Sequence, residues 1–485
     1  MKVIKFGGTS VGSAENIKRV KEIVLQQNEN AIVVVSALGG VTDKILNAAR
    51  MASIGTGYFH SELTEVKNRH YRIIEELFDD KGNDVFDRVD KLLKEMEKIL
   101  TGVTLVGELT PKTIDRIVGL GERMSSHIIA RYIPNAVWKN SADYIRTDSN
   151  FGKANVNFKV TNRLIKSEFE DFKGIAVTPG FIAGNDSGEY TTLGRGGSDY
   201  TAAIYASAIK ASSLDIWTDV DGFMTADPRV ISKAYTIKSL SYAEAMELSH
   251  FGAKVIYPPT ILPVYQKGIP IQIKNTLNPE GKGTLISQKD GNGKERPIKG
   301  ISSISGIALI TVQGLGMVGV TGISMRLFTA LAKEDINVIL ISQASSENSI
   351  SIAIEEQSIE KAEFAIRSEF EKEINIDQIN KIEIETKLSI VAIVGDNMKN
   401  TTGIAGKLFS TLGKSGINVI AIAQGASELN ISWVVKNSDL RKSLNVVHES
   451  FFLSENVELN VFLGCRNRWR ASFKPASTTT GKTFK

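Results

Sequence analysis

The sequence has 485 residues, of which 42% are hydrophobic and 23% charged, so it can build roughly three or four domain-sized units of an ordinary globular protein. Its formal net charge of +4 comes from a basic tail after Gly464, and the near-neutral remainder removes any charge-based case for nucleic-acid binding. The only cysteine, Cys465, excludes an internal disulfide and fits a reducing cytoplasm, and nothing resembles a signal peptide or a membrane span.

The first predicted element is a strand that ends at Phe6 and runs into Gly7 and Gly8, followed by an amphipathic helix. The apolar face of that helix is expected to hold Ile17, Val20, Val24 and Leu25. Glycines let backbone N–H groups approach a ligand, and a helix N-terminus favours negative charge. Because Lys5 adds a full positive charge, the segment predicts an anion site. It is not a Walker loop, in which the lysine follows the glycines.

A second small-residue loop follows a strand expected to be buried on both faces, residues 31–35. This loop, residues 36–42, lies at a strand's carboxyl end, where open α/β sheets bind ligands. Residues 43–101 are predicted to form packing helices, and Pro111 is expected to open a further helix that contains Glu122.

The segment richest in functional residue types lies between two further strands. A strand at 175–178 precedes Phe181, and the run 191–199 leads into a helix that is expected to span Tyr200 to Ile209. A strand at 214–218 and a helix from Tyr242 follow. Strands that alternate with helices predict a doubly wound, mostly parallel sheet.

The C-terminal part contains an internal repeat. Thr321-Gly322-Ile323 recurs as Thr402-Gly403-Ile404, and Gln343 recurs as Gln424, each after 81 residues. Each copy is predicted to be a small α+β ligand-binding module of strand, loop, helix, strand and strand. A Gly-x-Gly-x-x-Gly run at 314–319 is interpreted as loop geometry rather than as an NAD site, because the acidic residues precede the next strand instead of ending it.

Together, the segments from Lys5 to Lys254 closely resemble aspartokinases, members of the amino acid kinase family, and the resemblance extends to about Leu463. It implies an α/β/α sandwich kinase domain with a mostly parallel sheet, followed by two ACT modules. The expected boundaries are a catalytic domain at 1–280, a linker at 281–300, ACT modules at 301–385 and 386–455, and a remainder at 456–485. The implied reaction converts ATP and L-aspartate to ADP and 4-phospho-L-aspartate, the first step of lysine, threonine and methionine biosynthesis.

The resemblance also assigns roles to residues. It makes Lys5 and Asp199 catalytic, with Arg195 binding the α-carboxylate of aspartate. Glu122 and Asp199 are anionic partners for its ammonium. The remaining substrate contacts are expected from Ser36, Thr42, Phe181 and Ser198. ATP, carrying Mg²⁺ on its phosphates, is expected to contact Lys5, Gly7, Gly8, Thr218, Asp219, Met224 (where the family often has tyrosine), Arg229 and Lys254. No protein metal site is expected.

The regulatory part resembles threonine-sensitive aspartokinases that are fused to homoserine dehydrogenase. This predicts threonine at Gln343 and Gln424, whose amides can both donate and accept hydrogen bonds, and a homo-oligomer formed through the ACT modules. Residues 459–464 resemble the first strand of the dehydrogenase, after which the basic tail is interpreted as an out-of-frame or truncated end. The alternatives are another amino acid kinase, a catalytically silent amino-acid sensor, or a nucleic-acid or membrane arm in the tail.

Overall fold

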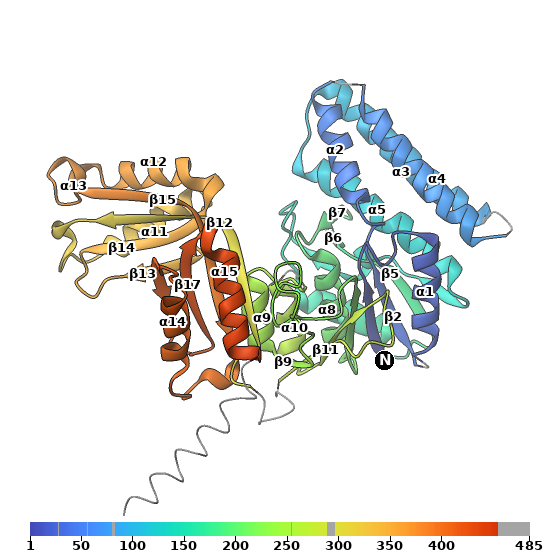
Figure 1. Ribbon diagram of the computed structural model, residues 1–485. Coiled ribbons are helices and arrows are strands. Elements are labelled where there is room, and N and C mark those ends of the chain that lie inside the picture. Colours follow the sequence, from blue (N-terminus) through green and yellow to red (C-terminus); the bar gives the residue numbers. More distant parts are fainter. Residues whose placement is uncertain (28, 56, 80–82, 254, 289–295, 454–485) are drawn as a thin grey trace, which may run out of the picture. The chain divides into compact units, whose positions relative to one another are not determined.

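The computed structural model describes residues 1–27, 29–55, 57–79, 83–253, 255–288 and 296–453. These residues form two compact units (Figure 1). The first unit comprises Met1–Pro228, Lys233–Ser302 and Val394–Asn397, and the second contains the intervening and following residues. None of the described helices is long and apolar enough to cross a membrane. The basic tail and residues 459–464, predicted to resemble the first strand of the dehydrogenase, lie outside the described residues.

The first unit is built on an eight-stranded sheet with the order β3-β5-β2-β1-β8-β10-β11-β9. Its strands are β1 (Lys2–Phe6), β2 (Ala31–Val35), β3 (Ala136–Trp138), β5 (Ile175–Pro179), β8 (Leu214–Thr218), β9 (Ser239–Ser241), β10 (Ile271–Asn275) and β11 (Thr284–Ser287). All pairings are parallel except that of β10 with β11. The predicted mostly parallel sheet is therefore confirmed. A small second sheet contains β4 (Arg146–Thr147), β6 (Ile182–Asn185) and β7 (Tyr190–Thr192).

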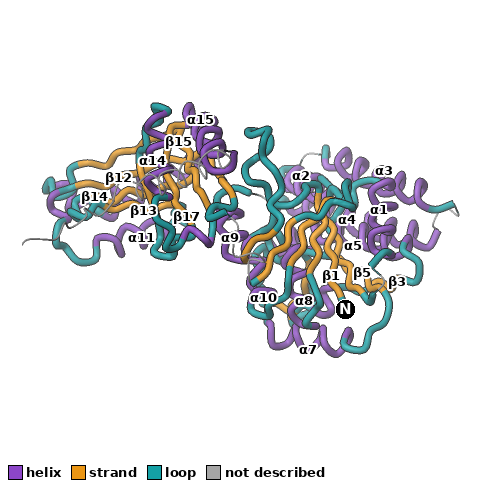
Figure 2. Tube along the Cα trace, turned by 60° about the horizontal axis from the view of Figure 1, so that its bottom comes forward, coloured by secondary structure: helices purple, strands orange, loops and turns teal. Residues whose placement is uncertain are grey.

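Helices cover both faces of the large sheet, as Figure 2 shows for α1 and α5 on one side and α7 and α8 on the other. Those of the first unit are α1 (Ala14–Leu25), α2 (Val41–Ser53), α3 (Phe59–Leu77), α4 (Asn83–Val106), α5 (Pro111–Tyr132), α6 (Ser141–Tyr144), α7 (Phe158–Phe169), α8 (Gly197–Ile209), α9 (Tyr242–His250) and α10 (Ile261–Tyr265). Two separate apolar cores result, one on each face. Ile4 and Phe6 of β1 enter the first core and Val3 enters the second, because side chains alternate along a strand.

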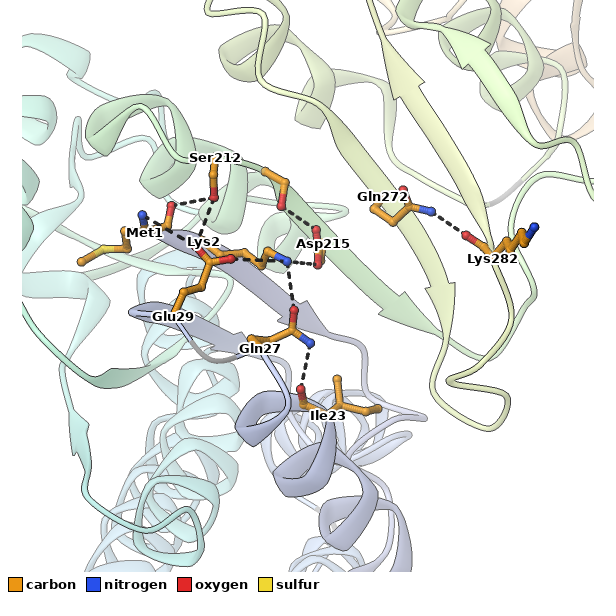
Figure 3. Close-up of polar contacts among 10 residues, drawn as sticks. Met1, Lys2, Ile23, Gln27, Glu29, Ser212, Asp215, Gln272 and Lys282 are labelled. Carbon is orange, nitrogen blue, oxygen red and sulfur yellow. Dashed lines mark hydrogen bonds and ion pairs between the residues drawn. The ribbon is translucent and has the colours of Figure 1, made fainter. Parts of the chain in front are cut away.

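Polar contacts fix the start of β1 at the end of the strand opposite Lys5 (Figure 3). Lys2 lies 3.2 Å from the Asp215 carboxylate and 3.6 Å from that of Glu29, and it donates to the Gln27 side chain at 2.9 Å. Since a slip of one residue would turn every side chain of β1 to the other face of the sheet, these contacts help to keep Lys5 on the side of α8.

The second unit contains a six-stranded sheet with the order β13-β14-β12-β15-β17-β16. Its strands are β12 (Gly300–Gln313), β13 (Leu340–Gln343), β14 (Ser349–Glu355), β15 (Lys381–Val394), β16 (Ala421–Ala423) and β17 (Asn430–Lys436). Its helices are α11 (Ile323–Lys333), α12 (Ile359–Glu369), α13 (Glu371–Asn375), α14 (Ile404–Lys414) and α15 (Asn437–His448). Each half repeats strand, helix, strand, strand and helix.

Backbone geometry reproduces the predicted repeat. Positive φ angles recur 81 residues apart, at Gly322 and Gly403 (both 90°) and at Glu347 and Glu428 (56° and 55°). The carboxylate of Glu347 accepts a hydrogen bond from the Gly319 N–H, and Glu428 makes the corresponding bond to the Asn400 N–H. The two modules are therefore duplicates down to their loop conformations.

Two local expectations differ from the structure. Leu25, expected on the buried face of α1, is 42% exposed, and Ile23 takes the buried position instead. The stretch 281–300, expected to be a linker, contributes β11, which pairs with both β10 and β9 in the main sheet.

Candidate functional site

A cavity of about 380 Å³ opens at the carboxyl ends of β1 and β2. It brings together the residues predicted to bind aspartate and to act in catalysis: Lys5, Ser36, Thr42, Glu122, Phe181, Arg195, Ser198 and Asp199. Gly8 lines the same cavity, as does Asp43, which the sequence argument missed. These residues come from five segments that are far apart in the chain.

Two helices begin at this cavity without a side-chain cap. The N-caps of α2 and α8 are Gly40 and Gly196, with φ angles of 80° and 68°, and neither forms a side-chain capping bond. A side chain at position 196 would clash with Tyr257, because an added Cβ would lie 2.4 Å from the Cβ atom of that tyrosine. The first N–H of each helix, that of Val41 and that of Gly197, donates to the Leu38 and Gly194 carbonyls at 2.9 and 3.0 Å. The N–H groups that follow them have no side-chain cap and can serve a ligand, and the helix dipoles favour an anion there.

Lys5 supplies the full positive charge at the same place. Its ammonium lies 2.6 Å from the Asp199 carboxylate, in the first turn of α8. Lys5 is only 8% exposed, so this ion pair sits at the edge of a poorly solvated site. Asp199 is expected from the sequence to contact the substrate ammonium, whereas in the structure it pairs with Lys5 and thereby fixes where the Lys5 ammonium points.

Glu122 adds a buried carboxyl group to the cavity. It projects from α5 and is 4% exposed; the Ala37 N–H donates to its carboxylate, and its Oε2 has no hydrogen-bond partner among the described residues. Burial raises the pKa of Glu122 to about 7, and the hydrogen bond from Ala37 opposes that rise only in part. A buried carboxylate with one free oxygen in a cavity suits a cationic ligand group.

The part of the cavity wall at Phe181 is held in an uncommon backbone conformation. Phe181 has a φ of 69°, and its N–H donates to the Thr201 hydroxyl at 2.9 Å, which in turn donates to the Gly197 carbonyl at 2.8 Å. At Gly180 an added Cβ would lie 2.7 Å from Ser198, so only glycine allows the two segments to approach this closely. Strained backbone of this kind is typical of binding sites.

Asp115, which was not among the predicted site residues, connects elements that carry cavity residues without lining the cavity itself. Its carboxylate accepts hydrogen bonds from the Thr192 N–H (2.9 Å), the Thr192 hydroxyl (2.7 Å) and the Gly152 N–H (2.9 Å). Asp115 lies two turns before Glu122 on α5, and Thr192 ends β7, three residues before Arg195. The only signal in the sequence is that seven-residue spacing on one helix face.

The residues predicted to bind ATP are only partly placed. The Gly7 N–H donates to the Trp217 carbonyl at 3.1 Å, so the first glycine loop adjoins the end of β8 and therefore Thr218 and Asp219. Met224 accepts a hydrogen bond at its sulfur from the Thr236 hydroxyl and does not line the cavity. Arg229 groups with the second unit, and Lys254 lies outside the described residues.

The two predicted effector residues occupy corresponding places in the second unit. Gln343 ends β13 and Gln424 directly follows β16, and both side chains are exposed. The edge strands β13 and β16 contact each other, so the two copies of the predicted effector segment lie close together.

Comparison with known proteins identifies families and relatives that share this architecture. The amino acid kinase family model matches residues 1–275, and an ACT domain model matches 310–370 and 391–451. The bifunctional aspartokinase/homoserine dehydrogenase 1 of Arabidopsis thaliana is 37% identical over 94% of this chain and 51% of its own length. Aspartokinase 1 of the same plant is 30% identical over 94% of this chain and 81% of its own length.

Among solved structures, E. coli aspartokinase III in complex with aspartate and ADP has a TM-score of 0.78 and 29% identity, covering 93% of this chain and all of that one. The chain spans about half the length of the curated bifunctional relatives that it matches. The kinase model matches more than half of the chain, two ACT modules follow, and the aspartokinase relative is covered over 81% of its length. The chain therefore belongs to the amino acid kinase family, among the aspartokinases.

Proposed function

We propose that this chain is an aspartate kinase, which transfers the γ-phosphoryl group of ATP to the side-chain carboxylate of L-aspartate. The single observation that carries the proposal is the cavity itself. It combines Arg195, Glu122, Lys5 and two uncapped helix N-termini, and this set matches an amino acid with two carboxylates and one ammonium that must meet a phosphate.

The chemistry requires two anions to approach each other. Arg195 offers a planar fork to the α-carboxylate, and ionised Glu122 takes the ammonium, so the second carboxylate is left to face Lys5. An oxygen of that carboxylate attacks the γ-phosphorus, the bond to the bridging oxygen breaks, and ADP leaves with the bond electrons. Because the attacking carboxylate is already ionised, no general base is required, and catalysis is mainly electrostatic stabilisation and positioning.

The N–H groups of α2 and α8 and the Lys5 ammonium would offset the charge on the transferring phosphoryl group. We treat Mg²⁺ as part of the MgATP substrate, bound to its phosphates, as is usual for this ion. Thr218 and Asp219, at the end of β8, are the proposed start of the nucleotide contacts, supported by the hydrogen bond from the Gly7 N–H to the carbonyl of the preceding residue, Trp217.

The direct test is ATP turnover with L-aspartate, in which hydroxylamine traps the acyl phosphate as its hydroxamate. We expect turnover in the wild type and none in Lys5→Ala, with Lys18→Ala on the outer face of α1 as the matched control. Hydroxamate formed faster with L-glutamate than with L-aspartate would favour another amino acid kinase. Wild-type protein that binds an amino acid effector but forms no acyl phosphate would indicate a silent sensor.

We also propose that a small amino acid regulates the enzyme through the second unit, with threonine as the first candidate. The support is the pair of exposed glutamines on adjoining edge strands, each of which can bind a backbone or a hydroxyl group. Lysine is the competing candidate, because E. coli aspartokinase III has been solved with lysine and aspartate. Calorimetric titration with both amino acids separates the two. Oligomerisation through the ACT modules and a cytoplasmic location remain part of this proposal.

A further inference from the structure

Two loops of the first unit meet beside Lys5. We call residues 7–12 the first loop and residues 36–40 the second loop; they follow β1 and β2. The Gly39 N–H donates to the Gly8 carbonyl at 2.9 Å, which joins the loops directly. The backbones of the two loops approach each other closely, since an added Cβ on Gly8 would lie 3.0 Å from the Ala37 carbonyl oxygen. The geometry of each loop therefore depends on that of the other.

One side chain from outside both loops holds them together. Arg69 projects from α3, and its guanidinium donates to the Gly39 carbonyl through one nitrogen and to the Gly12 carbonyl, at 3.0 Å, through the other. A planar guanidinium fixes the spacing of two acceptors in a way that a single ammonium cannot. None of the ion pairs formed within the described part of the chain involves Arg69, so its charge is not neutralised by a carboxylate there.

Holding these carbonyls has a consequence for the N–H groups of the loops. In a trans peptide the C=O and the following N–H point in opposite directions. By holding the Gly39 carbonyl, Arg69 therefore fixes the direction of the Gly40 N–H, at the N-cap of α2 and in the wall of the cavity. Its positive charge also lies directly behind the loops at which two anions would meet, where it lowers their mutual repulsion.

We infer that Arg69 is a positioning residue for phosphoryl transfer: it clamps the first and second loops in the geometry that aligns the phosphoryl donor with the acceptor carboxylate. This inference rests on the proposed function. Arg69 does not line the cavity, so it acts through the loop backbone rather than by touching the substrate.

The test compares Arg69→Met and Arg69→Lys with Arg72→Met, an exposed arginine one turn along α3, in the full-length chain. We expect kcat to fall about 100-fold in Arg69→Met, since misplacement of catalytic groups by about 1 Å has effects of that size. Arg69→Lys keeps the charge but not the fork, so it should recover part of the rate. Low-millimolar guanidinium should raise the activity of Arg69→Met and leave Lys5→Ala unchanged.

The inference is overturned if Arg69→Met keeps kcat within twofold of the wild type. It is also overturned if the loss only follows the folded fraction, measured by thermal melting, and does not respond to guanidinium. A wild type with no aspartate-dependent turnover instead refutes the proposed function. In that event ATP binding measured by calorimetry decides: affinity at least fivefold weaker in Arg69→Met than in Arg72→Met supports the clamp, and equal affinity rejects it.

Discussion

Glu122 connects the stability of the protein to pH at the scale of one residue. Its pKa is raised from 4.5 to about 7 because the charged form is desolvated. The folded state therefore binds more protons than the unfolded state between these values, so this contribution to stability is full below pH 4.5 and is lost as the pH rises through about 7. Replacing the carboxyl by the neutral amide in Glu122→Gln should abolish that slope.

The measurement is the free energy of unfolding in urea for both proteins from pH 5 to pH 8. We expect the unfolding free energy of the wild type to fall, relative to that of Glu122→Gln, by up to about 1.4 kcal/mol per pH unit within the window.

A substrate ammonium would lower the pKa of Glu122 again, so aspartate binding should release protons below pH 7, and the aspartate KM should decrease as the pH rises to that value. A constant stability difference across the range would show that Glu122 is already ionised.

The ion pair of Lys5 with Asp199 makes it possible to separate the effect of these charges on stability from their effect on turnover. Removing one partner leaves the other poorly solvated and unpaired, so Lys5→Met should cost about 1–3 kcal/mol of unfolding free energy. The double variant Lys5→Met/Asp199→Asn should recover most of that stability and none of the turnover. If the double variant is no more stable than the single one, the two charges do not interact appreciably in solution.

At the scale of elements, Asp115 determines how α5 and β7 are spaced, and with them Glu122 and Arg195. Asp115→Asn keeps the size of the side chain but replaces one acceptor oxygen with an amide donor that faces other N–H groups. We expect the aspartate KM to rise about tenfold or more, with the ATP KM within twofold, because only the amino-acid side of the cavity shifts. Equal changes in both KM values would mean a general loss of fold.

Helices and strands could be predicted where the local sequence pattern determines them, and less well where pairing with distant segments determines them. Periodicity and capping residues located α5 and the strands β1, β2, β5 and β8. The helix α8, however, begins at Gly197 rather than at Tyr200, which places Ser198 and Asp199 in its first turn. Strand β11 lies in a glycine-rich, charged stretch and exists because β10 and β9 supply its pairing.

The cavity shows the same division. The resemblance to aspartokinases predicted Lys5, Glu122 and Arg195 as site residues because each sits in a distinctive local segment, and the structure brings the three to one cavity. Asp115 and Arg69 could not, since their partners lie 77 and 57 residues away and their own surroundings resemble ordinary helix. The predicted residues that line the cavity sit in recognisable local segments, whereas Asp115 and Arg69 are recognised only from their contacts in the folded chain.

At the scale of the whole molecule, the duplication of the modules provides a test of the proposed regulation, because each copy carries an equivalent candidate site. Gln343 and Gln424 occupy equivalent positions, and the loops beyond them carry Glu347 and Glu428 with matching backbone angles and matching hydrogen bonds. Two equivalent sites on adjoining strands should bind an effector with similar contacts.

We therefore expect Gln343→Ala and Gln424→Ala each to weaken threonine binding, and the double variant to abolish it, in calorimetric titrations compared with Gln357→Ala as a matched exposed glutamine. In parallel, threonine inhibition of hydroxamate formation should shift to higher concentration in each single variant and disappear in the double one. If one substitution alone removes all binding, the duplicated modules would contain a single working site, and their symmetry would be structural only. Wild-type protein that binds lysine but not threonine would exclude threonine as the effector.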